Sequence, residues 1–216
     1  MSSIPNTSQP LKPHFTPGHH TAESPSTQAI IDTLQLQKHI EGGYFAEIDR
    51  DPLTIPNPFL NSAGDWPTTS PQPFSGDNSV RNASTSIYYL LTPTSPQGHF
   101  HRNKGRTVHT LIEGRGRYVL IHADEGGERK RVESFVVGKN VARGEKGVWI
   151  VEGGKYKASL LLSLDGGEAS GDRLLISETV VPGFEYSDHD FLAAEKFGEL
   201  VTEEQRVELD WLVRKY

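Results

Sequence analysis

The most constraining feature of this sequence is a series of short, apolar, β-branched segments between residues 84 and 181, separated by Gly, Pro or charged turns. Seven or eight strands at such spacing are typical of a β-sandwich or barrel. Helical patterns of 10–15 residues do not alternate with them, which argues against a parallel α/β sheet. We therefore predict an all-β fold with strands within 84–92, 99–103, 106–113, 116–124, 130–138, 147–153, 156–164 and 173–181.

The segments outside this region have different amino-acid patterns. Residues 1–25 are rich in Ser, Thr, Pro and His, which predicts a disordered tail. Residues 27–38 have near-helical apolar spacing and predict a short helix. A proline-rich insertion at 51–82 predicts a long irregular loop, either a lid over a site or a tolerated surface insertion. The organisation expected is a domain over 26–198 followed by a helix over 199–216, with residues 187–200 also helical.

Charge and composition narrow the classes of partner. The net charge of −6 disfavours general attraction to nucleic acid or to an anionic membrane. The absence of cysteine excludes disulfides and thiolate metal sites. No apolar stretch is long enough to span a bilayer, and the first residues lack the pattern of a secretory signal. We expect the protein in the cytoplasm, and a location in the nucleus is also compatible with the sequence.

Three histidines lie close together in the sequence. His99 and His101 are two residues apart, so on one strand they would share a face, with Cα atoms about 6.5 Å apart. His109, on the next predicted strand, would approach them across a hairpin. A shared pocket and a solvated strand face both fit this pattern.

Several motifs together resemble one family. EGGYF at 41–45, STSIYYLL at 84–91, FHR at 100–102, GVWIVEGGKYKA at 147–158 and VVPGFEYSDHDF at 180–191 are similar to the fifth cupin family, a sugar-epimerase-like set of unknown function, over about residues 30–195. The resemblance implies a double-stranded β-helix, or jelly roll, with a short N-terminal helix and C-terminal helices. It also implies a small-molecule ligand in the barrel mouth and a homodimer.

The general cupin metal site implies a ligand set that this chain matches only in part. His99 and His101 occupy the two positions of the HxH pair. Thr107 stands where the family pattern has a glutamate, and Lys157 stands where it has a later histidine. A lysine ammonium has no lone pair for a metal. A three-histidine site of His99, His101 and His109, with an open position for water, could instead hold a divalent ion, and no other cofactor is expected.

The alternative is chemistry without a metal. His101 and His109, with Tyr88 or Tyr156, would be the acids and bases of an isomerase or epimerase. Lys157 or Arg102 would anchor an anionic, carbohydrate-like substrate. Two further candidates are Glu47 and Arg50. They would either contact the substrate or form an ion pair on the surface.

Three functions are therefore compatible with the sequence. The first is an isomerase or epimerase, the second a metal-dependent oxygenase or lyase, and the third a metabolite-binding protein without catalysis. The fold does not decide among them.

Overall fold

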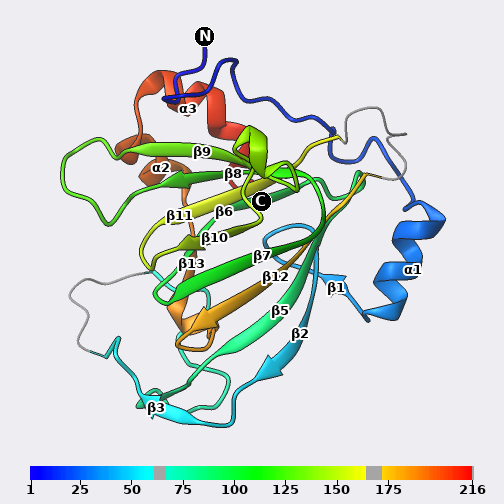
Figure 1. The fold of residues 1–216 in the computed structure, drawn as a ribbon. Coiled ribbons are helices and arrows are strands. Elements are labelled where there is room, and N and C mark those ends of the chain that lie inside the picture. Colours follow the sequence, from blue (N-terminus) through cyan, green and yellow to red (C-terminus); the bar gives the residue numbers. More distant parts are fainter. Residues whose placement is uncertain (61–66, 164–171, 216) are drawn as a thin grey trace.

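Two antiparallel sheets packed face to face form the body of the protein in the computed structural model, which describes residues 1–60, 67–163 and 172–215 (Figure 1). The six-stranded sheet has the order β1 (Gln37–Lys38), β2 (Tyr44–Arg50), β5 (Thr85–Leu91), β12 (Leu174–Val181), β7 (Arg106–Gly114) and β10 (Val148–Val151). The five-stranded sheet has the order β13 (His189–Phe191), β6 (Gln97–Asn103), β11 (Tyr156–Leu161), β8 (Gly116–Ile121) and β9 (Val132–Val137). The prediction of an all-β jelly roll is confirmed.

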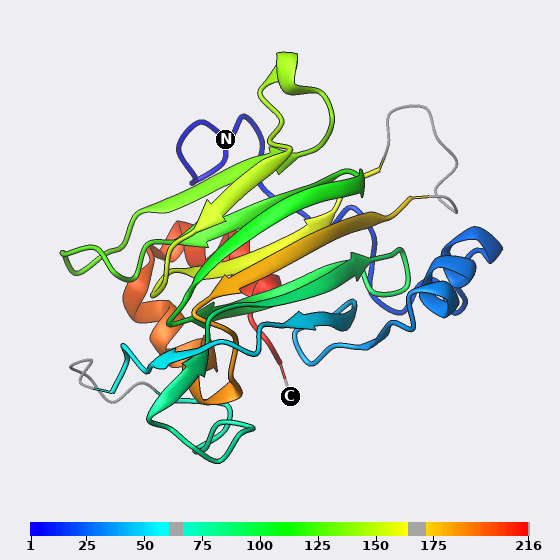
Figure 2. The ribbon, with the colours of Figure 1, turned by 60° about the horizontal axis from the view of Figure 1, so that its bottom comes forward.

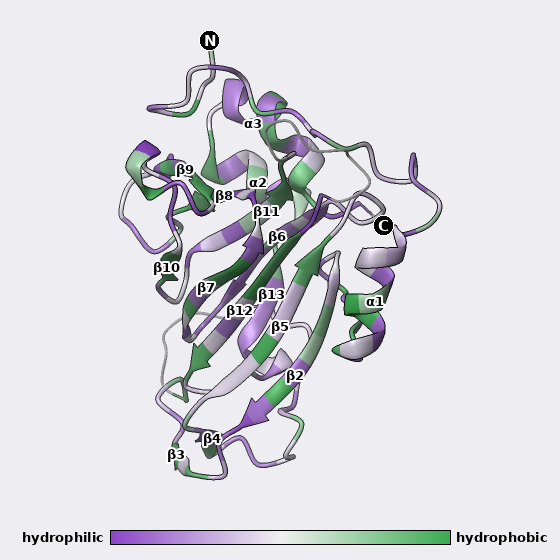
Figure 3. Cartoon of the chain, turned by 45° about the vertical axis from the view of Figure 1, so that its right-hand side comes forward, coloured by the Kyte–Doolittle hydropathy of each residue, from purple (hydrophilic) through white to green (hydrophobic). Residues whose placement is uncertain are grey.

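Side chains that alternate along each strand fill the space between the sheets. On β5, Tyr89 and Leu91 point inward and are 3% and 0% exposed. They pack with Ile176 of β12 and Tyr118 of β8 in one hydrophobic cluster. Figure 3 shows hydrophobic and hydrophilic residues alternating along these strands, as a half-buried strand requires. The apolar inner face is what holds the two sheets together.

Helices cover the outer faces of both sheets, on opposite sides of the molecule (Figure 1, Figure 2). Helix α1 (Pro25–Thr33) packs through Ile31 against Leu90 and Leu175 of the six-stranded sheet. Helices α2 (Ala194–Leu200) and α3 (Glu203–Leu209) pack through Phe197 and Leu209 against the five-stranded sheet. Among the described residues, none of these helices is long and apolar enough to cross a membrane.

The first 24 residues differ from the disordered tail that their composition predicted. They form no helix or strand, but Ile4, Leu11 and Phe15 are all at least 92% buried against the domain. Both carboxylate oxygens of Glu208 accept hydrogen bonds from Ser3 or Leu11 backbone N–H groups. These three apolar side chains hold an otherwise polar segment against the domain. The average composition of the segment does not reveal them.

The C-terminal region also differs from its prediction. The helix expected over 199–216 is shorter than predicted: α3 begins after a capping box between Thr202 and Gln205, ends at Leu209, and is followed by a 3-10 turn at Asp210–Leu212. In residues 187–200 the α-helix begins only at Ala194, since a 3-10 turn ends at Asp188 and His189–Phe191 then form strand β13 and pair with β6. Two ends of the predicted elements, Leu164 and Tyr216, lie outside the described residues.

The proline-rich insertion is attached to the barrel rather than projecting from it. Its ends form a small two-stranded sheet of β3 (Thr54–Pro56) and β4 (Val80–Asn82), and its residues 61–66 lie outside the described part of the chain. Arg81 of β4 donates two hydrogen bonds to Asp188, at 2.6 and 3.1 Å. Both side chains are buried, so this ion pair fixes the insertion to the segment that precedes β13.

Replacing Arg81 should therefore destabilise the fold. Arg81→Met leaves the Asp188 carboxylate buried with Lys104, at 3.5 Å, as its remaining ion-pair partner among the described residues, and we expect a loss of about 3 kcal/mol of unfolding free energy. Urea denaturation followed by fluorescence measures it. The control is Arg106→Met, which removes a half-exposed ion pair with Glu152 and should change stability by less than about 0.5 kcal/mol. Equal stability of both variants would show that the buried pair does not anchor the insertion.

Candidate functional site

A cavity of about 240 Å³ lies between the two sheets at the end of the barrel nearest the insertion. The inward face of β5 shows how it arises: Thr85 and Ile87 line the cavity, whereas Tyr89 and Leu91 continue into the hydrophobic core. The lining combines apolar side chains with many charged and polar ones. The apolar and aromatic members are Phe45, Phe74, Ile87, Val180, Phe184 and Tyr186, and the polar members are His39, Glu41, Glu47, Arg50, Thr85, His101, Asn103, Lys157, Glu178 and Glu185.

Glu41 enters the cavity because two glycines follow it. Gly42 has φ +105°, and a Cβ there would lie 2.1 Å from the carbonyl oxygen of Gln97. Gly43 has φ +71°, and its Cβ would lie 2.6 Å from the carbonyl oxygen of Leu90. Only glycine permits this close approach at a positive φ. The Glu-Gly-Gly sequence therefore presses the β1–β2 turn onto β5 and β6, and the carboxylate of Glu41 becomes buried.

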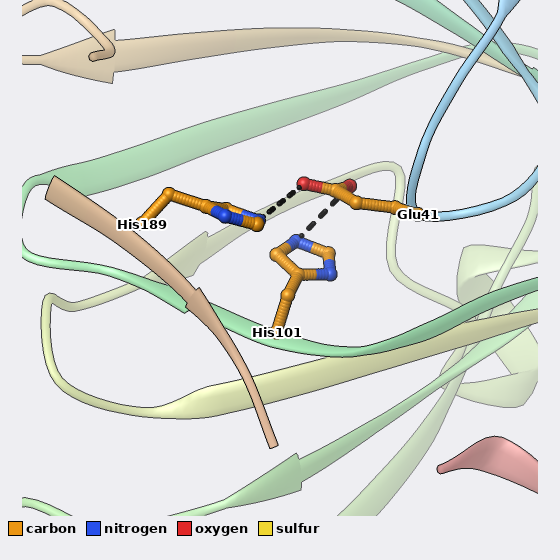
Figure 4. A group of neighbouring side chains, drawn as sticks. All are labelled: Glu41, His101 and His189. Atoms are coloured by element: carbon orange, nitrogen blue, oxygen red, sulfur yellow. Dashed lines mark hydrogen bonds and ion pairs between the residues drawn. The ribbon is translucent and has the colours of Figure 1, made fainter. Parts of the chain in front are cut away.

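Three histidines surround this carboxylate, two of them shown with it in Figure 4. Nε2 of His189, on β13, lies 2.9 Å from Oε1 of Glu41, and Nε2 of His101, on β6, lies 3.2 Å from Oε2. Nδ1 of His39 lies 3.4 Å from Oε2. Burial alone would raise the pKa of Glu41, but interactions with His101, His39 and His189 lower it well below its usual value. Glu41 is therefore an anion at neutral pH.

The neutral ring of His101 has no proton to place between itself and Glu41. Its Nδ1 lies 2.8 Å from the carbonyl oxygen of His99, which can only accept, so Nδ1 carries the proton. Burial lowers the pKa of His101 to about 3, and the ring is neutral near pH 7. The lone pair of Nε2 then faces the carboxylate of Glu41. A cation bound between Nε2 of His101 and the carboxylate of Glu41 would accept electron pairs from both groups.

The other histidine of the pair is held in a similar way. Nδ1 of His189 lies 2.7 Å from the hydroxyl of Thr69, a residue of the insertion, and the Thr69 backbone N–H donates to the His189 carbonyl. A histidine whose second nitrogen is fixed by a hydrogen bond is the usual arrangement of a metal ligand. The described residues contain one group of three potential metal ligands whose ligand atoms all lie within 4.8 Å of one another. Its members are Glu41, His101 and His189. Two imidazoles and one carboxylate fit a divalent transition-metal ion.

A second charged cluster occupies the neighbouring wall. Nζ of Lys157 donates to Oε2 of Glu178 at 2.9 Å and to Nε2 of His109 at 3.1 Å. Burial lowers the pKa of His109, and the nearby Lys157 lowers it further. Burial would raise the pKa of Glu178, but Lys157 and His109 lower it well below its usual value. This wall therefore holds a charged lysine and a carboxylate in a fixed contact.

The cavity lining carries an excess of negative charge. Its four carboxylates, Glu41, Glu47, Glu178 and Glu185, face two basic side chains, Lys157 and Arg50. Both basic groups are already paired: Lys157 with Glu178, and Arg50 with Glu47 at 2.8 Å and Glu185 at 3.2 Å. Such a lining attracts a cation and offers no unpaired positive charge to an anion.

The predicted site residues divide between the cavity and other places. His101, Lys157, Glu47 and Arg50 line the cavity. His109 is fully buried behind it, in contact with Lys157 and stacked on Trp149 with ring centroids 5.0 Å apart.

Tyr88, Tyr156 and Arg102 lie on outer faces of the sheets. Tyr88 packs with the cluster beneath α1. Tyr156 packs with the cluster beneath α2 and α3, where its hydroxyl donates to Asp190. Arg102 also binds Asp190 and lies over the Tyr156 ring. Strand alternation places these three side chains opposite the cavity, so they do not join His101 there.

The predicted three-histidine metal set is not the group that comes together. Lys157 pairs with His101 whereas Ser159 pairs with Gly98, so β6 has an extra residue at this point and its alternation is broken. The ring of His99 consequently bonds the Glu41 carbonyl oxygen rather than lining the cavity. His109 belongs to the lysine cluster. His101 alone of the three lies beside Glu41 and His189.

Sequence reasoning missed Glu41 and His189 as metal-ligating candidates. Both lie in motifs quoted for the family resemblance, EGGYF and VVPGFEYSDHDF. The glycine pair after Glu41 was the available signal for a residue held in an unusual turn. No comparable local signal marks His189, because its segment has a helix-like pattern.

One family model matches most of the chain, and similar proteins are known from other organisms. The family model described as Cupin superfamily (DUF985) matches residues 28–192. An uncharacterized protein of Saccharomyces cerevisiae is 43% identical over 194 residues, covering 88% of each chain. A hypothetical protein from Leishmania major has a TM-score of 0.67 at 27% identity, covering 87% of this chain and 98% of that one. A Shewanella oneidensis protein, at 20% identity and TM-score 0.63, covers 90% of this chain and 100% of its own, and supports the fold alone.

The buried neutral His101 should make the metal-free protein sensitive to acid. Between pH 6.5 and 5 the unfolded chain takes up a proton at this histidine, whereas the folded chain does not until about pH 3. Stability therefore falls as pH falls, by about 1.4 kcal/mol per pH unit for this one proton. We expect His101→Asn to show a correspondingly flatter decline in chelator-treated samples, measured by urea denaturation at each pH. The control His14→Asn, at an exposed position, should keep the wild-type slope. Identical slopes for His101→Asn and wild type would contradict a neutral buried ring.

Proposed function

The chain belongs to the cupin superfamily (DUF985), and we propose that it is a metal-dependent enzyme in which Glu41, His101 and His189 hold a divalent ion. The observation that carries this proposal is the lone pair of His101 Nε2 facing the ionised Glu41 at 3.2 Å. A bound divalent ion supplies Lewis-acid polarisation of a substrate oxygen. Two imidazoles and one carboxylate leave further coordination positions open for that substrate.

The charges of the lining indicate a small neutral substrate. With a divalent ion beside Glu41, the formal charges of the four carboxylates are matched by the ion, Lys157 and Arg50. An uncharged ligand then enters without leaving a buried charge unpaired, which would be costly. Oxygen atoms, as in a carbonyl or hydroxyl group, would contact the ion. An anionic carbohydrate fits less well, because both basic side chains of the lining are ion-paired.

Lys157 is suited to stabilise charge on the substrate. An ammonium group has three N–H donors, and Glu178 and His109 take two of them. Lys157 lines the cavity and lies opposite His101 on adjacent strands, so its third N–H is available to a ligand beside the metal-ligating set. A fixed cation of this kind favours reactions in which negative charge grows on a substrate oxygen, such as enolisation or aldol-type cleavage.

A second candidate is an isomerase that works without a metal. Its support is the unprotonated Nε2 of His101, a residue of the cavity lining, which could accept a proton from a substrate. The tyrosine of such a site would be Tyr186, since Tyr88 and Tyr156 lie outside the cavity. Metal binding that depends on Glu41 and His189 separates the two candidates. Ligand binding without turnover would leave a metabolite-binding protein.

We also propose a homodimer, which the exposed edge of the six-stranded sheet supports. Val148 and Ile150 of the edge strand β10 are 60% and 44% exposed, and Ile112 of the adjacent β7 is 40% exposed. An apolar patch at an unpaired strand edge invites association.

Metal binding should depend on the three proposed ligands. Wild-type protein, stripped with chelator and titrated with Co²⁺ or Ni²⁺ in a calorimeter, should bind one ion per chain. Glu41→Gln and His189→Asn should each weaken binding at least 100-fold, because each removes a direct ligand. Thr69→Val, which frees the second nitrogen of His189, should weaken it by about 10-fold.

His14→Ala is the matched control for these variants. It removes an exposed histidine that does not line the cavity and should leave metal affinity unchanged. Thermal melts of the metal-free variants verify that they fold. Wild-type affinity in folded Glu41→Gln and His189→Asn proteins would rule out the proposed metal site.

The dimer proposal predicts a mass of two chains by light scattering. Val148→Lys combined with Ile150→Lys should give a monomer, because two charges would have to be buried at the interface. Val207→Lys, on the exposed face of α3, should leave the mass unchanged. A monomeric wild-type protein would contradict the proposal.

A further inference from the structure

The mouth of the cavity has an aromatic character that the metal-ligating set does not explain. Phe184 and Tyr186 form an edge-to-face pair with ring centroids 5.0 Å apart, and both line the cavity. Tyr186 also lies edge-on to the ring of His189, at 6.0 Å. The aromatic wall is thus continuous with one proposed metal ligand.

Phe74 completes this wall from the insertion. Its side chain lines the cavity yet is 93% exposed, an unusual state for a phenylalanine. Its backbone is held in place, since the Phe74 N–H donates to Oε2 of Glu185 at 2.7 Å. The other oxygen of Glu185 accepts from Arg50, so the carboxylate ties the insertion to β2 at the rim. An uncovered ring on an anchored backbone is a surface that a ligand can cover.

From this arrangement we infer that the substrates of the site carry a planar aromatic ring, bound at the mouth between Phe74, Phe184 and Tyr186, with their oxygen atoms directed inward. The inference rests on the proposed metal-dependent function and specifies its substrate class. Ring-to-ring contacts at edge-to-face geometry favour an aromatic group over a saturated one of equal size. The paired charges of Arg50 and Glu185 at the rim offer no site for a charged group there.

Three hydroxamates test the inference, because they share one metal-chelating group and differ only in the attached group. Acetohydroxamate has a methyl group, benzohydroxamate an aromatic ring, and cyclohexanecarbohydroxamate a saturated ring. Each is titrated into the Co²⁺-loaded full chain, followed by calorimetry and by the visible absorption of the ion. Each affinity is divided by the affinity of that compound for free Co²⁺.

Benzohydroxamate should bind about 10-fold more tightly than either of the other two compounds. Phe74→Ala should reduce that advantage about 5-fold and leave acetohydroxamate binding unchanged, since acetohydroxamate has no ring for Phe74 to contact. Leu53→Ala removes another exposed apolar side chain, one that does not line the cavity, and should change neither value.

The outcomes distinguish the inference from the function on which it rests. If acetohydroxamate binds but the aromatic and saturated rings bind equally, or Phe74→Ala has no effect, the aromatic subsite is overturned and the metal site stands. If the protein retains Co²⁺ but binds none of the three compounds, the ion is inaccessible to substrate and both proposals fail.

Discussion

A carboxylate buried among three imidazoles is the interaction on which the rest of this site depends. Removing an ion from water costs several kcal/mol, and the neutral ring of His101 does not repay that cost as a cation would. Glu41 is nevertheless ionised, and His101 presents it with a lone pair. A divalent ion satisfies the carboxylate and both rings at once. The negative charge of the whole cavity lining has the same consequence, since it attracts a cation to this end of the barrel.

The jelly roll brings these groups together from distant parts of the chain. The β1–β2 turn contributes Glu41, β6 contributes His101, and β13 contributes His189. The insertion then fixes the last of these through Thr69 and carries Phe74 to the cavity mouth. The insertion is therefore part of the site. Its buried attachment to the segment before β13 connects the stability of the fold to the position of a proposed ligand.

Sequence patterns predicted the sheets well because strand alternation is a local property, visible in segments such as 84–92. The site depends on contacts that local patterns do not contain. His99 and His101 were expected on one face, but a bulge against β11 separates them. The direction of Glu41 is set by the approach of Gly42 to a carbonyl 55 residues away, at Gln97. His189 lies in a strand whose pairing with β6 overrides a helix-like sequence.

The most direct test of the account is anomalous X-ray diffraction from crystals grown with Mn²⁺ or Co²⁺. We expect one strong anomalous peak per chain within bonding distance of Nε2 of His101, Nε2 of His189 and the carboxylate of Glu41. A peak bound elsewhere, or ordered Glu41 and histidine side chains with no peak at saturating metal, would contradict it.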